Sequence, residues 1–310
     1  MNVIVYLEND VKAFSVTDEH IKRIRNRFPL WDIFRVTDET SFLEHLDLAD
    51  LVITWKFKAQ WYYKAPKLKA LFTPAAGQDW IEKVKDFDVA VFHGTFHGTI
   101  MAESLLSMIL YFNRRIPQAV LQQKNHIWDR DFLNQTSRLS TQHVVIVGYG
   151  TIARECARVL KVFGCRITGV KHSPYDCTLD KDTYAICHPD QIENVLRSCD
   201  HLVSILPGTE SNNCFFNKKR FSAIKPGAFF YSIGRGNCCK DEDLLWALDR
   251  ELIAGAGLDV CYQEPLSQNS SLWDYPDVLI VPHGAAIVRD YMALYFKELC
   301  DVLENFADYQ

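Results

Sequence analysis

The stretch Val144-Val145-Ile146-Val147-Gly148-Tyr149-Gly150-Thr151-Ile152-Ala153 decides the fold of this 310-residue chain. Its β-branched run predicts a buried strand, and the apolar spacing after the turn predicts a helix. At such a turn, Gly148 permits the tight bend and Gly150 lets the backbone approach a pyrophosphate. The phosphates would lie on the amides of Thr151 and Ile152, at the helix N-terminus. We therefore predict a dinucleotide site here, against the alternative of a merely structural turn.

Short apolar runs recur beyond this turn, with helix-like segments between most of them. In the second half of the chain they occupy residues 143–147, 166–170, 202–206, 228–233, 256–260 and 278–281. Six short strands in this alternation predict a doubly wound parallel sheet, the Rossmann arrangement.

The N-terminal third repeats the alternation in a smaller unit. Strand-like runs lie at 3–7, 51–55 and 68–73, helix-like segments at 17–28 and 291–306, and one long amphipathic helix is expected over 101–123. We predict an α/β fold in which a dinucleotide-binding domain (99–284) is inserted into a smaller, flavodoxin-like α/β substrate-binding domain (1–98 plus 285–310).

Composition narrows the classes of function. With a formal net charge of −5, the chain has no basic footprint for nucleic acid or an anionic membrane. No apolar run approaches the ~20 residues of a membrane-spanning helix, and residues 1–7 lack the features of a signal peptide. The ten cysteines show neither a Cys-x-x-Cys pair nor zinc spacing to histidine. We expect a cytoplasmic protein without a metal site, nucleic-acid partner or membrane partner.

The residues after the second strand of the larger domain bear on whether the cofactor is NAD(H) or NADP(H). An NAD site expects Asp or Glu about twenty residues beyond the glycines, where it accepts hydrogen bonds from ribose hydroxyls. Lys171 occupies that place, followed by His172 and Ser173. These three side chains would bind a 2′-phosphate that a carboxylate would repel. We expect NADP(H) to be preferred and NAD(H) to be possible, the alternative being a solvated lysine beside an NAD site.

Three charged residues follow strand-like runs of the second half. They are Arg235, Glu264 and His283. All three would emerge at the carboxyl ends of parallel strands, the edge where open α/β sheets bind ligands. Arg offers a fork for a carboxylate, His can donate a proton to a developing alkoxide, and a paired Glu favours imidazolium. Separately, they would be a surface charge, a turn residue and a capping histidine. Together they predict 2-keto acid reduction.

At these positions the chain resembles the D-isomer-specific 2-hydroxyacid dehydrogenases, over nearly its whole length. The resemblance rests on Gly148-x-Gly150-x-x-Ala153, Leu206-Pro207-x-Thr209, Gly234-Arg235-Gly236, Gly257-Leu258-Asp259-Val260 followed by Glu264-Pro265, Pro282-His283, and Ala75-Ala76-Gly77-Gln78-Asp79. Lys171 departs from it, because Asp is common there.

The resemblance implies roles for these residues. Arg235 would bind and polarise the keto acid, and His283 would be the general acid–base supported by Glu264. Further cofactor contacts would come from the matching motif residues Leu206, Pro207, Thr209, Ile233, Gly234 and Asp259, the last holding the nicotinamide carboxamide with backbone near Ile233. The loop with Ala76 and Gly77 would hold the substrate carboxylate. A homodimer formed through the cofactor domains is also implied.

We therefore expect hydride transfer between NAD(P)H and C2 of a small 2-keto acid, bound between the domains and most like glyoxylate or hydroxypyruvate. Two alternatives remain on the same fold: a nucleotide-sensing binding or corepressor protein, and a formate- or phosphite-type dehydrogenase.

Overall fold

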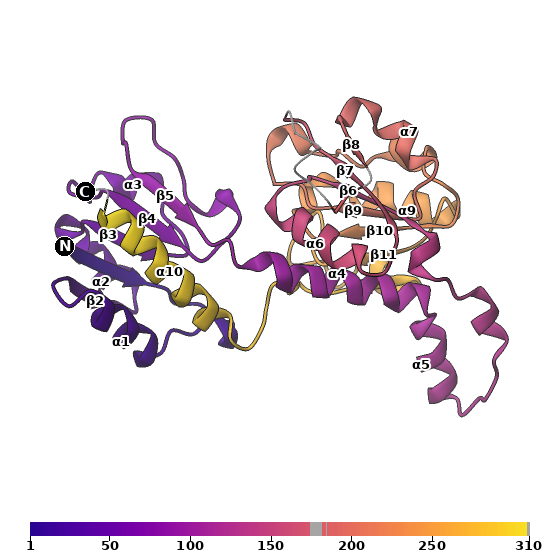
Figure 1. Cartoon of the computed structure of the whole chain (residues 1–310), viewed down its shortest axis with the longest axis horizontal. Coiled ribbons are helices and arrows are strands. Elements are labelled where there is room, and N and C mark those ends of the chain that lie inside the picture. The colour runs from indigo at the N-terminus through magenta and orange to yellow at the C-terminus, as the bar shows by residue number, and fades with distance from the viewer. Residues whose placement is uncertain (174–181, 184, 309–310) are drawn as a thin grey trace. The chain divides into compact units, whose positions relative to one another are not determined.

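The computed structural model describes residues 1–173, 182–183 and 185–308. The chain forms two compact units, one of residues Met1–His97 and Ile287–Gln310 and one of residues Gly98–Ala286. Each unit has its own parallel sheet (Figure 1).

Unit 1 contains a five-stranded parallel sheet in the order β2-β1-β3-β4-β5. Its strands are β1 (Asn2–Tyr6), β2 (Asp32–Arg35), β3 (Leu51–Thr54), β4 (Ala70–Thr73) and β5 (Ala90–His93). This is the flavodoxin-like order that we expected. Strands β2 and β5 were not predicted, because neither is a fully buried apolar run of the kind that marks β3 and β4.

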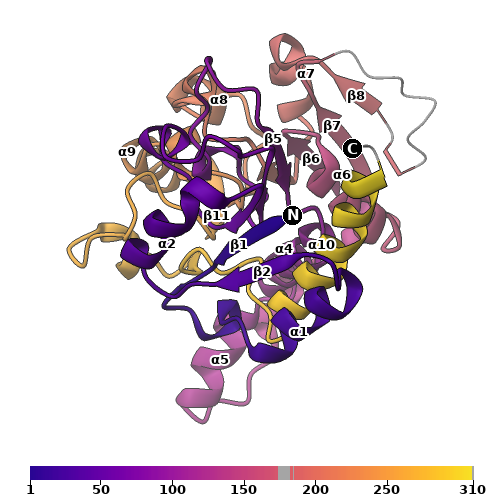
Figure 2. The same cartoon turned by 90° about the vertical axis from the view of Figure 1, so that its left-hand side faces the viewer.

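The helices of unit 1 come from both ends of the chain. They are α1 (Asp18–Arg27), α2 (Glu39–His45), α3 (Ala59–Tyr62) and α10 (Tyr291–Asp308), with short 3₁₀ helices at Lys12–Phe14, Leu46–Leu48 and Gln78–Trp80. The C-terminal α10 lies beside α1 (Figures 1 and 2). An ion pair joins Arg27 to Glu304, and the rings of His20 and Phe296 stack 4.9 Å apart. The last helix is therefore an integral layer of the N-terminal unit.

Unit 2 contains a seven-stranded parallel sheet in the order β12-β11-β10-β9-β6-β7-β8. Its strands are β6 (His143–Val147), β7 (Arg166–Val170), β8 (Ala185–Cys187), β9 (His201–Ser204), β10 (Ala228–Ser232), β11 (Ile253–Leu258) and β12 (Val278–Ile280). The order turns in both directions from β6, which confirms the predicted doubly wound fold. Six of these strands match predicted runs. The half-buried, three-residue β8 was missed.

Helices cover both faces of this sheet. They are α4 (His97–Asn113), α6 (Thr151–Lys161), α7 (Ile192–Leu196), α8 (Lys218–Ser222) and α9 (Asp241–Asp249), with 3₁₀ helices at Asp131–Gln135, Leu139–Thr141, Pro189–Gln191, Glu210–Asn212, Gly236–Cys238 and Ser271–Asp274. A further helix, α5 (Ile116–Lys124), has no buried residue and projects away from the sheet (Figure 1). Residues of α4 and α6 share one buried cluster, and residues of α7, α8 and α9 share the other.

The single helix predicted over 101–123 was wrong, because the chain breaks it in two. Helix α4 ends at Asn113, Arg115 adopts the left-handed region with φ of 52°, and α5 then begins at Ile116. Pro117 lies in the first turn of α5, where its missing N–H costs nothing, whereas within a continuous helix it would clash with the preceding turn. The apolar periodicity runs through the break and therefore did not reveal it.

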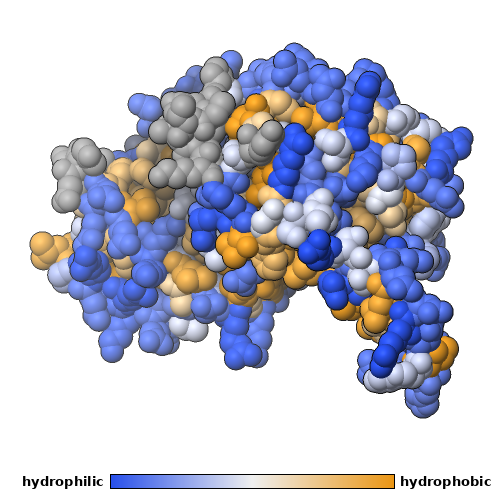
Figure 3. Space-filling view, turned by 45° about the vertical axis from the view of Figure 1, so that its right-hand side comes forward, coloured by the Kyte–Doolittle hydropathy of each residue, from blue (hydrophilic) through white to orange (hydrophobic). Residues whose placement is uncertain are grey.

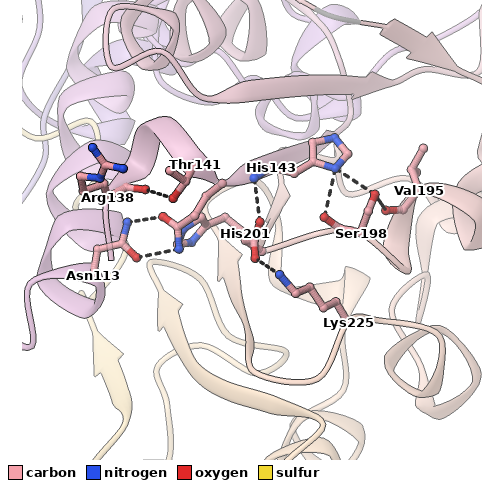
Figure 4. A network of polar contacts seen from close by, with 10 residues as sticks. Asn113, Arg138, Thr141, His143, Val195, Ser198, His201 and Lys225 are labelled. Atoms are coloured by element: carbon pink, nitrogen blue, oxygen red, sulfur yellow. Dashed lines mark hydrogen bonds and ion pairs between the residues drawn. The ribbon is translucent and has the colours of Figure 1, made fainter. Parts of the chain in front are cut away.

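A polar network lies at the amino-terminal edge of the sheet in unit 2 (Figure 4). The buried His201 ring contacts the Tyr231 hydroxyl through Nδ1 at 3.0 Å and the Gln142 Oε1 through Nε2 at 3.0 Å. Gln142 in turn exchanges two hydrogen bonds with Asn113 at the end of α4. Burial lowers the pKa of His201 to about 4, so this ring is neutral at pH 7.

Cysteines in the described part of the chain are free thiols, nine in number. Seven are buried, while Cys187 and Cys214 are half-buried. Within these same residues no group of three metal-ligating side chains occurs, and no helix is long and apolar enough to cross a membrane. Cys177 lies outside the described residues.

Candidate active site

The turn between β6 and α6 has the geometry of a phosphate cradle. Gly148 takes φ of +90°, and a Cβ atom there would lie 2.5 Å from the Ile205 carbonyl oxygen. Gly150, the N-cap of α6, is different, because a Cβ atom there would meet nothing within 4 Å. The fold thus requires the first glycine, while the second leaves open space before the amides of Thr151 and Ile152. A dinucleotide pyrophosphate fits this arrangement.

The loops after β9 and β10 meet at the same carboxyl edge. A Cβ atom on Gly234 would lie 2.6 Å from the Leu206 carbonyl oxygen, so the two backbones touch. Ile233 is buried and donates its N–H to the Ser204 carbonyl at 3.0 Å. Pro207 and Thr209 are exposed, and the Thr209 carbonyl accepts a hydrogen bond from Asn237. The structure therefore brings the predicted residues of these two loops together.

Lys171, His172 and Ser173 directly follow β7, the strand next to β6. The Lys171 side chain is half-buried, and His172 and Ser173 are exposed. They therefore occupy the place where a doubly wound fold recognises the adenosine ribose. Sequence reasoning missed His188, whose ring centroid lies 5.0 Å from that of His172. Its only signal was its place directly after the unpredicted β8.

His283 and Glu264 form a hydrogen-bonded pair at the ends of β12 and β11. The His283 Nδ1 and the Glu264 Oε2 are 2.7 Å apart, and Glu264 Oε1 accepts the Cys261 N–H at 3.1 Å. The bond to Glu264 raises the pKa of His283 despite partial burial. Burial raises the pKa of Glu264, but the bond and charge of His283 outweigh it and leave that pKa below its usual value. Both groups are thus held in their charged forms.

Asp259 holds the loop that carries His283. Its Oδ1 accepts the N–H groups of Gly284 and Ala285, both at 2.7 Å, and its carbonyl accepts the His283 N–H at 2.8 Å. His283 has φ of 48°, a left-handed conformation that such bonds can fix. Burial raises the pKa of Asp259, against the lowering effect of these two amide donors. A positioning role toward His283 is thus visible in addition to the carboxamide contact that the resemblance implied.

Arg235 lies in the loop after β10 and belongs to the same charged cluster. Its guanidinium donates to the Gly234 carbonyl at 3.1 Å, and its Cγ would lie 3.2 Å from a Cβ built on Gly208. The charge of Arg235 lowers the pKa values of both Glu264 and His283. The three predicted catalytic side chains are therefore close enough in unit 2 to act on one another.

Ala76 and Gly77 lie in unit 1, in the loop between β4 and the 3₁₀ helix Gln78–Trp80. Ala76 is exposed and Gly77 is half-buried, and the preceding Ala75 N–H is held by the Thr73 hydroxyl at 3.3 Å. Gly77 has φ of −71° and ψ of 134°, an extended conformation open to any residue. The loop that is predicted to bind the substrate carboxylate therefore lies at the surface of unit 1, in an extended conformation at Gly77.

Comparison with known proteins identifies the family. Residues 106–285 match the model described as D-isomer specific 2-hydroxyacid dehydrogenase, NAD binding domain. The chain belongs to this family. Unit 2 is accordingly the NAD-binding domain of a D-isomer specific 2-hydroxyacid dehydrogenase, an NAD(P)-dependent oxidoreductase.

Two curated relatives of this dehydrogenase are both named glyoxylate/hydroxypyruvate reductase A. The one from Photorhabdus laumondii is 29% identical over 197 residues, which are 64% of this chain and 61% of the relative. The one from Serratia proteamaculans is 28% identical over 255 residues, 79% of this chain and 80% of the relative. The solved NADPH-dependent glyoxylate/hydroxypyruvate reductase of Sinorhizobium meliloti, in complex with NADP and sulfate, is 25% identical with a TM-score of 0.81, covering 99% of this chain and 95% of that one.

Proposed function

We propose that this dehydrogenase reduces a small 2-keto acid, glyoxylate or hydroxypyruvate, with NADPH. The observation that carries the proposal is the 2.7 Å contact between His283 Nδ1 and Glu264 Oε2, at the sheet edge that also holds the glycine turn. An imidazolium held beside a carboxylate is a general acid for a developing alkoxide.

The side chains divide the work between binding and proton transfer. A bound nicotinamide dinucleotide supplies the hydride that C2 accepts. Arg235 holds the keto-acid carboxylate with its fork of donors and polarises the adjacent carbonyl. With Nδ1 bonded to Glu264, His283 transfers the proton on Nε2 to the carbonyl oxygen, giving a 2-hydroxy acid. In the oxidative direction neutral His283 takes that proton back.

The choice of substrate and cofactor rests on two kinds of support. The relatives named above are glyoxylate/hydroxypyruvate reductases, and the Sinorhizobium meliloti enzyme is called NADPH-dependent and was solved with NADP. In this chain, Lys171, His172 and Ser173 follow β7, where NAD sites carry a carboxylate. NADPH is therefore the proposed reductant, and NADH is the weaker one. Initial rates with both reductants against glyoxylate, hydroxypyruvate, pyruvate and a bulky aromatic keto acid test this choice.

Replacing His283 with Ala tests the chemistry directly. General acid catalysis contributes roughly 10²- to 10⁴-fold, so kcat for keto-acid reduction should fall by about that factor. Dinucleotide affinity, measured by fluorescence titration, should change little. The exposed His126 offers a matched control, and His126→Ala should retain full turnover. Near-normal turnover in His283→Ala would overturn the assignment.

We also propose a homodimer built through unit 2. Helix α5 and the segment after it project from this unit and expose a set of large apolar side chains (Figures 1 and 3). They are Ile116, Val120, Leu121, Ile127, Trp128 and Leu133, of which Trp128 is 89% exposed. Apolar surface of this kind is typical of a protein interface. In light-scattering chromatography the unaltered chain should therefore elute as a dimer, and a Val120→Asp, Trp128→Asp double variant should elute as a monomer.

We place the enzyme in the cytoplasm. Its free cysteines, buried for the most part, are typical of a chain kept in a reducing compartment.

A further inference from the structure

Two histidines lie side by side where β7 and β8 end. His172 lies two residues beyond β7, and His188 directly follows β8. Their ring centroids are 5.0 Å apart, with an angle of 53° between the ring planes. The Lys171 N–H donates to the Cys187 carbonyl at 3.0 Å, so the two segments stay paired up to the histidines. The resemblance to other dehydrogenases gave His188 no role.

Both histidines lie at strand ends that are close to the expected position of the adenosine ribose. In a doubly wound fold the end of the second strand recognises the adenosine ribose. Here that strand is β7, and β8 is its outer neighbour in the parallel sheet. The carboxyl end of β8 therefore borders the position of the ribose hydroxyl groups, on the side of β7 opposite to β6.

The His188 ring is oriented by the backbone of the short helix that it caps. Its Nδ1 accepts the Asp190 N–H at 3.4 Å and also lies 3.2 Å from Asp190 Oδ2, which leaves Nε2 as the nitrogen available to a ligand. With Nδ1 as the acceptor, the ring carries its proton on Nε2, where it can donate a hydrogen bond to a phosphate oxygen. Charged and titratable groups on the adjoining described elements include Lys171 and His172 after β7 and Cys187 at the end of β8. Asp190 and the Lys161–Asp182 ion pair between α6 and the segment before β8 also belong to this set.

We propose that His188 is a further specificity-determining residue, which binds the 2′-phosphate of NADP(H) together with Lys171 and His172. This inference rests on the proposed use of NADP(H). It extends the residues that select the cofactor from the end of β7 to the end of the neighbouring strand β8.

Calorimetry with two small probes tests the proposal without any turnover. Adenosine 2′,5′-bisphosphate carries the 2′-phosphate, whereas adenosine 5′-monophosphate (AMP) is otherwise identical and lacks it. The matched variants are His188→Asn and His126→Asn. Asn preserves the N-cap function at position 188 and tolerates the left-handed backbone of residue 126. We expect His188→Asn to lose about three- to tenfold in affinity for the 2′-phosphate probe, and to bind AMP as the unaltered protein does.

The outcomes separate this inference from the proposed function. If His188→Asn binds the 2′-phosphate probe as tightly as the unaltered protein and His126→Asn do, the role of His188 is overturned while the nucleotide site stands. If the unaltered protein binds both probes equally, the NADP(H) preference falls and this inference falls with it. Failure of the unaltered protein to bind either probe would overturn the nucleotide site itself.

Discussion

His283 owes its protonation state to its neighbours. Its pKa is raised chiefly by the hydrogen bond to Glu264, and the charge of Arg235 opposes this. Both side chains of the pair are more than one-third exposed, so its catalytic value lies in orientation and proton supply and not in stability. At this scale the function depends on a single hydrogen bond that fixes both the ring and its proton.

Replacing Glu264 with Gln tests that dependence through the pH profile. Keto-acid reduction needs protonated His283, so kcat/KM falls as pH rises through the pKa of this ring. Glu264→Gln lowers that pKa, and the basic limb should move to lower pH. A limb that moves by one pH unit should lower the rate at a fixed pH on this limb about tenfold. A profile with an unmoved basic limb would contradict the role of Glu264. Rates in the acid range serve as the control, because His283 is protonated there in both the unaltered protein and the variant.

The placement of the charged side chains at one sheet edge was predictable because each of them follows an apolar run. Arg235, Glu264 and His283 come after predicted strands, and parallel strands bring their carboxyl ends to one edge. The positioning bonds of Asp259 were not predictable. They depend on the left-handed turn at His283, a conformation that nothing in the local sequence requires, since only glycine adopts it readily.

At the scale of elements, the two glycines of the β6–α6 turn have different functions: one is required by the backbone conformation, and the other leaves space for the ligand. Gly148 has a positive φ and no room for a Cβ atom, whereas Gly150 has ordinary negative φ and open space around it. The same motif thus contains one structural glycine and one glycine whose side-chain volume is left for the ligand.

Alanine at each glycine should therefore give opposite results. Gly150→Ala should leave the free energy of unfolding of the unliganded protein within about 0.5 kcal/mol and weaken dinucleotide affinity about tenfold or more, because its methyl group enters the pyrophosphate position. Gly148→Ala should destabilise the unliganded protein by about 1–3 kcal/mol. Urea denaturation and nucleotide titration of both variants would check this. Full nucleotide affinity in a folded Gly150→Ala protein would refute the cradle.

Element type was readable from sequence wherever burial made the pattern clear. The buried runs of β3, β4, β6 and β9 were all predicted. The half-buried β12 was still predicted, because its residues Val278–Ile280 are large and aliphatic, whereas the half-buried β8 has only the short run Ala185–Cys187. The break at Arg115 depends on one left-handed residue before Pro117. Local propensity alone does not specify such positions.

At the scale of the whole molecule, buried neutral histidines link stability to acidity. Burial lowers the pKa values of both His97 in unit 1 and His201 in unit 2 to about 4. Histidine in the unfolded chain titrates near 6.5. As pH falls below that value, the unfolded chain takes up protons that the folded chain refuses, so stability present at neutral pH is lost between about 6.5 and 4.

The variant His201→Asn should flatten this dependence. Over that range one such histidine costs about 3 kcal/mol of unfolding free energy, so the unaltered protein should lose stability more steeply than the variant from pH 7 to pH 5. Denaturation midpoints in urea at pH 7, 6 and 5 measure the slopes. His126→Asn, altered at an exposed site, should keep the slope of the unaltered protein. Equal slopes in all three proteins would show that His201 is not the linked group.

The free cysteines of unit 2 can be used to follow the unfolding of this unit by chemical labelling. Burial raises the pKa of Cys165 to about 11 and that of Cys156 to about 12, and the pKa values of Cys199 and Cys239 are raised as well. Alkylating reagents react with the thiolate, so these cysteines do not react while the sheet around them remains folded. Because they lie on α6 and in the segments next to β7, β9 and β10, the order in which they are labelled would map which layer of unit 2 opens first.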